Sequence, residues 1–186
     1  ILAGEAVVFI DPKSDRFAAR VLAQAAKQAK RKFRLVNLNP DQPPQINPLL
    51  GAAEHDIEEL FVAGFDLRAR GTEGDFYRGG DEDAAMAVAA LAVEQGIQSF
   101  PELFQACGAE ENITGHDNFW RQFRKLVQLP AINTRKGVDL RGAIESGEVI
   151  YIVGSCDNER VIKLQKMLLL RLMQIVKGQG RSKVAR

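Results

Sequence analysis

A strand, a helix and a second strand in immediate succession constrain the fold of this chain most strongly. The hydrophobic run AVVFI at residues 6–10 ends in the polar turn DPKS, and a second run, FRLVNLN, begins at Phe33. Between the two runs, apolar residues recur at helical spacing after a cap at Ser14 or Asp15. A helical crossover of this length joins parallel strands. The sequence therefore predicts an α/β fold with a parallel sheet.

Material of the same kind returns near the end of the sequence. The segment GEVIYIVGS at residues 147–155 reads as a third buried strand, and Asp157 or Asn158 is placed to cap the helix that follows. From about residue 158 to 176 that helix is apolar on most of its circumference, which favours a position packed deep against the sheet. Between strand and helix, we expect Cys156 to be a small buried thiol.

The middle of the chain has a different character. Apolar residues at residues 52–129 follow helical spacing, and no alternating strand pattern interrupts them. Residues 52–119 carry 15 Asp and Glu against 3 Lys and Arg, whereas residues 1–51 carry 4 against 8 and residues 120–186 carry 5 against 14. We therefore predict an inserted all-helical domain at residues 52–129, framed by an α/β portion at residues 1–51 and 130–186.

Composition limits the class of protein. A chain of 186 residues with 46 % hydrophobic residues can bury a substantial core. No apolar run approaches the roughly 20 residues that a membrane-spanning helix needs. Two cysteines far apart give no disulfide framework, so we expect a cytoplasmic protein. The start at ILAGEAVV leads us to expect a piece of a longer protein.

Three segments carry a resemblance to a known family. GEAVVFIDPKSD, RLVNLNPDQPPQINPLLG and DLRGAIESGEVIYIVGSCDNERVIKLQKMLLLRLMQ are similar to the nucleotide-binding region of TraD-type coupling proteins of conjugation and type IV secretion, which are P-loop ATPases related to FtsK and HerA. The resemblance is strongest at the two ends of the chain and weak in its helical middle. It implies part of a RecA-like parallel sheet with an inserted all-alpha domain, lying between the phosphate-binding loop and the acidic Walker B strand.

The family implies a function for the intact protein. It would be a DNA-dependent ATPase that uses ATP and Mg²⁺ to deliver DNA to a type IV secretion channel in bacteria. Its partners would be DNA, the relaxosome and secretion components, and it would form a homohexamer anchored to the inner membrane by segments outside this chain. The alternative is a non-catalytic module in which the acidic helical domain recruits relaxosome proteins or secretion substrates.

Neither ATPase motif is present in the sequence itself. A P-loop needs glycines whose backbone N–H groups wrap the phosphates, followed by Lys and Ser or Thr. Lys13-Ser14 supplies only the last pair, after a strand and a proline, and GQGRSK near the end has the wrong glycine spacing. His55 and His116 lack the paired spacing of a zinc site. We therefore expect the isolated chain to hydrolyse no ATP and to bind no cofactor or metal.

Asp11, Lys13 and Ser14 are the candidate nucleotide-site residues. Ligands of parallel α/β sheets bind outside the carboxyl ends of the strands, and these three residues follow the first strand. In the intact motor they would border the nucleotide pocket, with Lys13 adding positive potential. The other interpretation is a plain turn in which Asp11 accepts hydrogen bonds from backbone donors. The family usually has glycine after the lysine, where this chain has Ser14.

Basic residues are the candidate contacts to nucleic acid or to a neighbouring subunit. A DNA motor must contact the phosphates of the DNA backbone whatever the base sequence is. A helix carboxyl end attracts cations in any protein, so the first cluster also has a purely structural explanation. The candidates are Lys27, Lys30 and Arg31 near the end of the first helix, Arg121, Arg124 and Lys125 in the middle segment, and Arg160 after the third strand.

Overall fold

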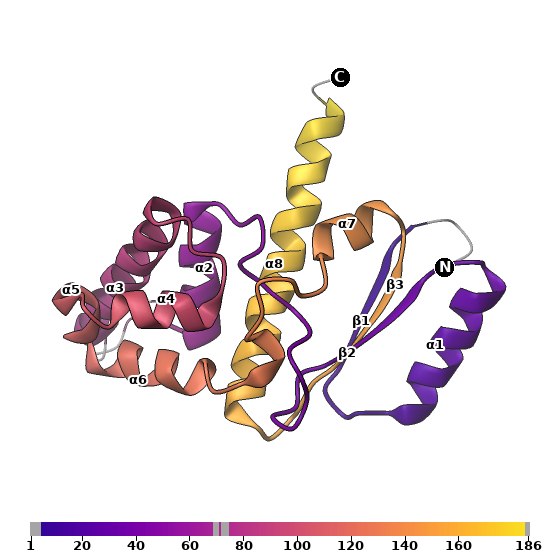
Figure 1. The fold of residues 1–186 in the computed structure, drawn as a ribbon, viewed down its shortest axis with the longest axis horizontal. Helices are drawn as coiled ribbons and strands as arrows, with labels where there is room; N and C mark the ends of the chain where they lie inside the picture. The colour runs from indigo at the N-terminus through magenta and orange to yellow at the C-terminus, as the bar shows by residue number, and fades with distance from the viewer. Residues whose placement is uncertain (1–4, 69–70, 72–74, 185–186) are drawn as a thin grey trace. The chain divides into compact units, whose positions relative to one another are not determined.

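The computed structural model describes residues 5–68, 71 and 75–184 and divides into two compact units. Unit 1 consists of Ile1–Asn47 and Leu129–Ile162, and unit 2 consists of Pro48–Gln128 and Lys163–Arg186. The α/β class predicted from the sequence is confirmed, because unit 1 contains a parallel sheet and a crossover helix (Figure 1).

The elements follow one another along the chain in this order: β1 (Val7–Asp11), α1 (Arg16–Gln28), β2 (Phe33–Asn37), α2 (Glu54–Phe65), α3 (Asp75–Glu94), α4 (Phe100–Cys107), α5 (Glu111–Thr114), α6 (Asp117–Leu126), the 3-10 turn η1 (Pro130–Ile132), α7 (Leu140–Glu145), β3 (Val149–Val153) and α8 (Glu159–Val184). Among the described residues of the middle segment, every regular element is helical. No helix in the described ranges is long and apolar enough to cross a membrane.

The sheet of unit 1 has three parallel strands in the order β1-β3-β2. The crossover through α1 therefore skips one position, and the last strand in sequence fills it. In the register, Phe9, Tyr151 and Leu35 lie side by side on one face. Residues 149–152 of the central strand are fully buried, as their continuous apolar run requires. All three strands end at the same edge, which we call the carboxyl edge.

Helix α1 begins at a side-chain cap and packs on the sheet through small residues. The Asp15 carboxylate accepts hydrogen bonds from the backbone N–H groups of Phe17 and Ala18, at 2.8 and 3.3 Å. Ala26 is fully buried, whereas Phe17 is exposed. At the other end Lys30 takes a left-handed conformation, with φ at 54°, that closes the last turn. The helix thus carries the chain from the carboxyl edge back to the amino edge of the sheet.

A close backbone contact joins the two chain segments that make up unit 1. A parallel bridge pairs Ile46 with Val138. A Cβ atom on Gly137 would lie 2.5 Å from the Ile46 carbonyl carbon and the Asn47 nitrogen, a distance that no side chain tolerates. Glycine is therefore required at this position for the two segments to meet.

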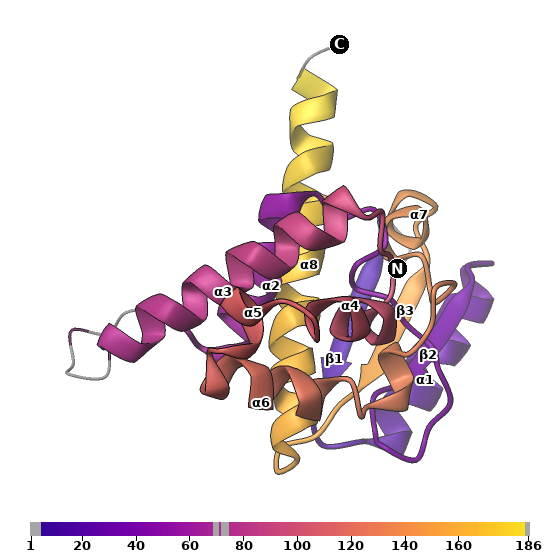
Figure 2. The same ribbon diagram turned by 60° about the vertical axis from the view of Figure 1, so that its left-hand side comes forward.

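The core of unit 2 is built from phenylalanines. Phe61 of α2 lies at the centre, with ring centroids 5.0 Å from Phe123 and 5.6 Å from Phe119, both on α6. All three side chains are fully buried. Trp120 stacks on Phe104 at 4.3 Å. These edge-to-face and stacked contacts fix the helices that Figure 2 shows around α2 and α3.

The position of α8 differs from the sequence prediction. Only its first turn belongs to unit 1, and from Lys163 onward the helix belongs to the helical unit. A Cβ atom on Gly64 of α2 would lie 2.5 Å from the Met167 side chain, so the two helices approach closely there. The buried Arg171 guanidinium also binds the start of α2, 3.1 Å from Asp56 Oδ2. Helix α8 therefore contacts α2 through Met167 and Arg171, both of which are buried.

Candidate functional site

The Asp11 carboxylate organises the turn at the end of β1. Oδ1 accepts a hydrogen bond from the Lys13 backbone N–H at 2.9 Å, and Oδ2 accepts hydrogen bonds from the Asp15 N–H and the Tyr151 hydroxyl. The Tyr151 hydroxyl also lies 3.1 Å from the carbonyl oxygen of Asp15. Asp11 is buried, whereas Lys13 and Ser14 are exposed. The turn therefore holds the backbone of Lys13 at the carboxyl edge and leaves its ammonium group in solvent.

These contacts set the ionisation of the pair. Burial alone would raise the pKa of the Asp11 carboxyl, but the hydrogen bonds from Tyr151 and from the backbone of Lys13, Asp15 and Ser14 outweigh it, and the pKa is lowered. Burial and the neighbouring Asp11 carboxylate raise the pKa of the Tyr151 hydroxyl. Asp11 is thus a carboxylate and Tyr151 a neutral donor near neutral pH.

The turn after β3 lies against the turn after β1. The Gly154 N–H donates to the Asp11 carbonyl oxygen at 2.8 Å, and Cys156 Sγ lies 3.3 Å from the Pro12 carbonyl oxygen. Asn158 caps α8, because its Oδ1 accepts from the Arg160 and Val161 N–H groups at 3.1 and 3.3 Å. One of the two predicted caps is therefore confirmed.

Cys156 and Asp157 in this turn differ from the sequence predictions. Cys156 is exposed, so the prediction of a buried thiol is wrong; the strand ends at Val153 and the turn carries the cysteine outward. Asp157 does not cap the helix but accepts a hydrogen bond from the Ser155 hydroxyl at 2.5 Å, which lowers the pKa of its carboxyl. Arg160 follows in the first turn of α8, at the same edge as Lys13.

Ser14 adopts the backbone conformation that glycine favours. Its φ angle is 57°, in the left-handed region, which costs a residue with a side chain about 1 kcal/mol. We expect Ser14→Gly to raise the free energy of unfolding of unit 1 by about 0.5–1 kcal/mol, and Ser14→Val to lower it. Denaturant-dependent hydrogen exchange of the β1 and β3 amides measures these changes in the free energy of unfolding. Equal exchange in the wild type and in Ser14→Gly would contradict a left-handed turn at Ser14.

The first basic cluster lies away from the candidate nucleotide residues. Lys27, Lys30 and Arg31 follow the direction of α1 to the amino edge of the sheet, at the opposite ends of the strands from Asp11 and Lys13. The structure therefore places these two predicted groups at opposite edges of the sheet. Lys27 and Lys30 are exposed, and Arg31 is partly buried.

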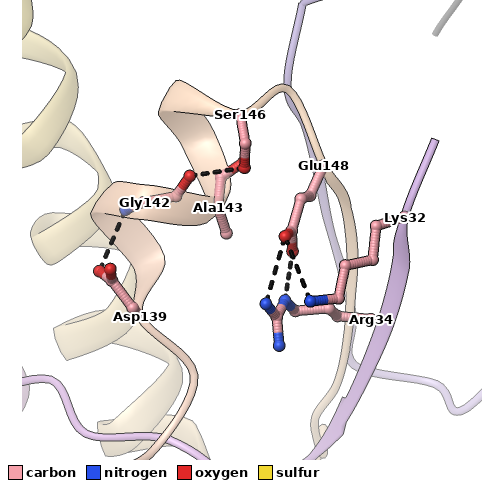
Figure 3. Close-up of polar contacts among 7 residues, drawn as sticks. All are labelled: Lys32, Arg34, Asp139, Gly142, Ala143, Ser146 and Glu148. Carbon is pink, nitrogen blue, oxygen red and sulfur yellow. Dashed lines mark hydrogen bonds and ion pairs between the residues drawn. The ribbon is translucent and has the colours of Figure 1, made fainter.

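A buried carboxylate lies at the same amino edge. Glu148 accepts hydrogen bonds from Arg34 Nε and from Arg34 Nη2, the latter at 3.2 Å, and the Lys32 ammonium lies 3.6 Å away (Figure 3). The bidentate bond from Arg34 lowers the pKa of the Glu148 carboxyl. Nearby, Asp139 caps α7 through the Gly142 N–H at 3.0 Å. The cluster ties β2 to the start of β3.

Acid should weaken unit 1 partly through Glu148. A carboxyl whose pKa is lower in the folded than in the unfolded chain contributes stability above its unfolded pKa, and this contribution is lost as the pH falls through the folded pKa. We expect unfolding to become easier below about pH 4.3, the ordinary pKa of Glu. Glu148→Gln should cost about 1–3 kcal/mol at pH 7 and reduce this acid dependence. Urea titrations at pH 7 and pH 3 measure both effects, and an unchanged acid dependence in Glu148→Gln would contradict the assignment.

The second basic cluster lies on one helix of unit 2. Arg121, Arg124 and Lys125 are exposed on α6, while Phe119 and Phe123 bury the opposite side of the helix. No ion pair among the described residues uses these three cations, although Arg121 Nη2 lies 3.3 Å from Asn118 Oδ1. Helix α6 therefore presents a positive face on an otherwise acidic segment.

The carboxyl edge can contact an anion through Lys13 but offers no assembled metal site. Both oxygens of Asp11 are occupied by donors of the protein. Among the described residues, no group of three or more His, Cys, Asp or Glu is arranged to hold a metal ion. The chemistry available at this edge is electrostatic attraction of a phosphate or carboxylate to an exposed ammonium group.

Tyr151 was not predicted from the sequence to be part of this site. A tyrosine inside an otherwise aliphatic buried strand was the available signal, because a buried hydroxyl must find a hydrogen-bond partner. The register places Tyr151 beside Phe9, which lies two residues before Asp11 in β1, and the two rings stack with their centroids 5.3 Å apart. Its hydroxyl thereby reaches the carboxylate that shapes the Lys13 turn.

Comparison with known proteins gives one similarity that covers nearly the whole chain. No model of a protein family matches the sequence. Over 175 residues, 93 % of this chain, the sequence is 31 % identical to Mobilization protein A of Escherichia coli. The chain spans only 32 % of the length of that protein. The similarity thus relates this chain to about a third of a mobilization protein.

Proposed function

We propose that this chain is part of a longer protein that acts in the conjugative mobilization of DNA. The observation that carries the proposal is the similarity of 93 % of the chain to Mobilization protein A of Escherichia coli. The resemblance of the DPKS turn and of the third strand to conjugation ATPases comes from the residues themselves and favours the same process. DNA and relaxosome proteins are the partners that such a role requires.

Within this process, we propose that unit 1 is part of the nucleotide-binding sheet of a coupling motor of the TraD type. Three features favour this. The strands are parallel, a crossover helix begins next to Lys13, and α8 begins at the same edge. In such sheets ligands lie beyond the carboxyl ends of the strands. The sheet would form part of a RecA-like P-loop fold, and the motor would be a homohexamer that serves a type IV secretion channel.

The residues at the carboxyl edge fit a phosphate better than they fit a magnesium ion. ATP would supply the phosphoryl group whose transfer drives movement of DNA. Lys13 would attract its phosphate oxygens, while Asp11 and Tyr151 would hold the Lys13 backbone in place. Both carboxylate oxygens of Asp11 already accept hydrogen bonds from the protein, so we assign no described residue to Mg²⁺. Ser14 would act through the left-handed turn that it forms.

The exposed cations away from that edge would serve DNA contact. On α6, Arg121, Arg124 and Lys125 are free of carboxylate partners among the described residues, which leaves them available to phosphates. Lys27 and Lys30 form a smaller exposed group at the amino edge. We place these contacts on the cytoplasmic side of the membrane, where donor DNA is processed.

Plasmid transfer from donor cells tests this proposal. Deleting the gene in donors that carry the mobile element should abolish transfer, and the full-length wild-type protein supplied from a second plasmid should restore it. Viability and plasmid copy number serve as controls, because a replication defect would also reduce transfer. Transfer at wild-type frequency from the deleted donors would refute the proposal.

A further inference from the structure

Helix α3 of unit 2 carries an exposed apolar stripe with an acidic rim. Met86 and Val93 are 53 % and 49 % exposed, and Ala90 is exposed between them, so the three residues follow the i, i+4, i+7 spacing of one helix face. Asp83 and Glu94 lie at the two ends of this stripe, and both are exposed. No described ion pair uses either carboxylate.

Helix α8 carries an equivalent stripe with a basic rim. Leu169, Met173 and Val176 are 53 %, 47 % and 56 % exposed and have the same i, i+4, i+7 spacing. Lys166 and Lys177 lie at its two ends, exposed and without a carboxylate partner among the described residues. Apolar side chains that are exposed together in this way mark an interaction surface rather than scattered surface residues.

The two stripes match position by position. Asp83 corresponds to Lys166, Met86 to Leu169, Ala90 to Met173, Val93 to Val176 and Glu94 to Lys177, each pair separated by 83 residues. Helices with this spacing can pack along their apolar faces, and the small Ala90 leaves room for the long Met173. Opposite charges then meet at both ends, whether the helices run parallel or antiparallel.

We propose that the α3 stripe of one copy of this protein binds the α8 stripe of a second copy. The charge complementarity selects this occupant, because an acidic rim excludes another α3 stripe and a basic rim excludes another α8 stripe. The contact joins two different surfaces of the same unit, so it is a head-to-tail contact that leaves one free surface at each end of a pair. Such contacts add copies into a ring or a row. Figure 1 shows the two helices that carry the stripes.

Two variants of the full chain test the proposal by sedimentation velocity. Ala90→Glu blocks the α3 stripe and Met173→Glu blocks the α8 stripe, since each places a carboxylate at the centre of an apolar contact. Both positions are exposed helix sites, and the fluorescence of Trp120, the single tryptophan, checks that the core of unit 2 is intact. Gln105→Glu, exposed on α4, adds the same charge outside either stripe and is the matched control.

The mixing result is decisive. The wild type and Gln105→Glu should associate with rising concentration beyond dimers, and each blocked variant alone should associate at least tenfold more weakly. An equimolar mixture of Ala90→Glu and Met173→Glu should form a 1:1 dimer and nothing larger, because the mixture offers one intact stripe of each kind. A monomeric wild type, unimpaired association of either blocked variant, or a mixture that stays monomeric would overturn the proposal.

Discussion

Arg171→Ala should lower the free energy of unfolding of unit 2 by about 3–5 kcal/mol. The Arg171 side chain is 2 % exposed, and its guanidinium binds Asp56 Oδ2 at 3.1 Å and the Leu50 carbonyl oxygen at 3.0 Å. Truncation removes both bonds, leaves a partly buried carboxylate without its cation, and opens a cavity between α8 and the start of α2. Urea unfolding followed by Trp120 fluorescence measures the change.

Two control variants distinguish the effect of breaking the ion pair from the effect of removing a positive charge alone. Arg124→Ala removes an exposed cation of the same unit and should change stability by no more than about 0.5 kcal/mol. The double variant Arg171→Met with Asp56→Leu removes both charges and retains volume, so it should recover most of the lost stability. A loss below 1 kcal/mol in Arg171→Ala would show that the ion pair does not secure α8 to α2.

Lys13→Ala in the full-length protein should lower DNA transfer and DNA-stimulated ATP hydrolysis about tenfold or more. A cation that meets a developing phosphate charge contributes on the order of 1–3 kcal/mol, and each 1.36 kcal/mol corresponds to a factor of ten in rate. Folding should survive, because the Lys13 side chain is exposed and its backbone, not its ammonium group, carries the bond to Asp11. Mating frequency and ATP turnover are the measurements.

A matched lysine outside the carboxyl edge provides the control for Lys13. Lys136 is exposed on a loop of unit 1, and its backbone N–H donates to the Thr134 hydroxyl at 3.0 Å. Lys136→Ala therefore removes the same charge from the same unit and should leave transfer unchanged. If Lys13→Ala were as active as the wild type, the DPKS turn would have a structural role only.

The sequence predicted the three strands well because each is a short apolar run with a clear end. AVVFI overlaps β1, and FRLVNLN and GEVIYIVGS contain β2 and β3. The strand order could not be predicted from such patterns, because no feature of the β3 sequence indicates that this strand lies between β1 and β2. The helical character of the middle segment was equally visible, because the spacing of Ile57, Phe61 and Phe65 is set by the helix alone.

The packing partner of α8 could not be read from its composition. A helix that is apolar around most of its surface predicts burial without saying against what. Arg171, an isolated cation in the middle of that surface, was the available signal that a carboxylate must lie opposite, and Asp56 is that carboxylate. At the carboxyl edge, likewise, the position of Asp11 followed from the end of a strand, but its bond to Tyr151 depends on a register that only the folded sheet defines.

Photolabelling of the full-length protein with an azido derivative of ATP tests the central claim most directly. If the carboxyl edge of the sheet borders a nucleotide, peptide mapping should place the label in residues 11–16 or 153–160, and excess ATP should abolish it. Ser14 and Cys156 lie in those peptides, while Lys27 to Arg34 lie at the opposite edge. Label that ATP competes away but that maps to residues 27–34, or to unit 2 alone, would contradict the account.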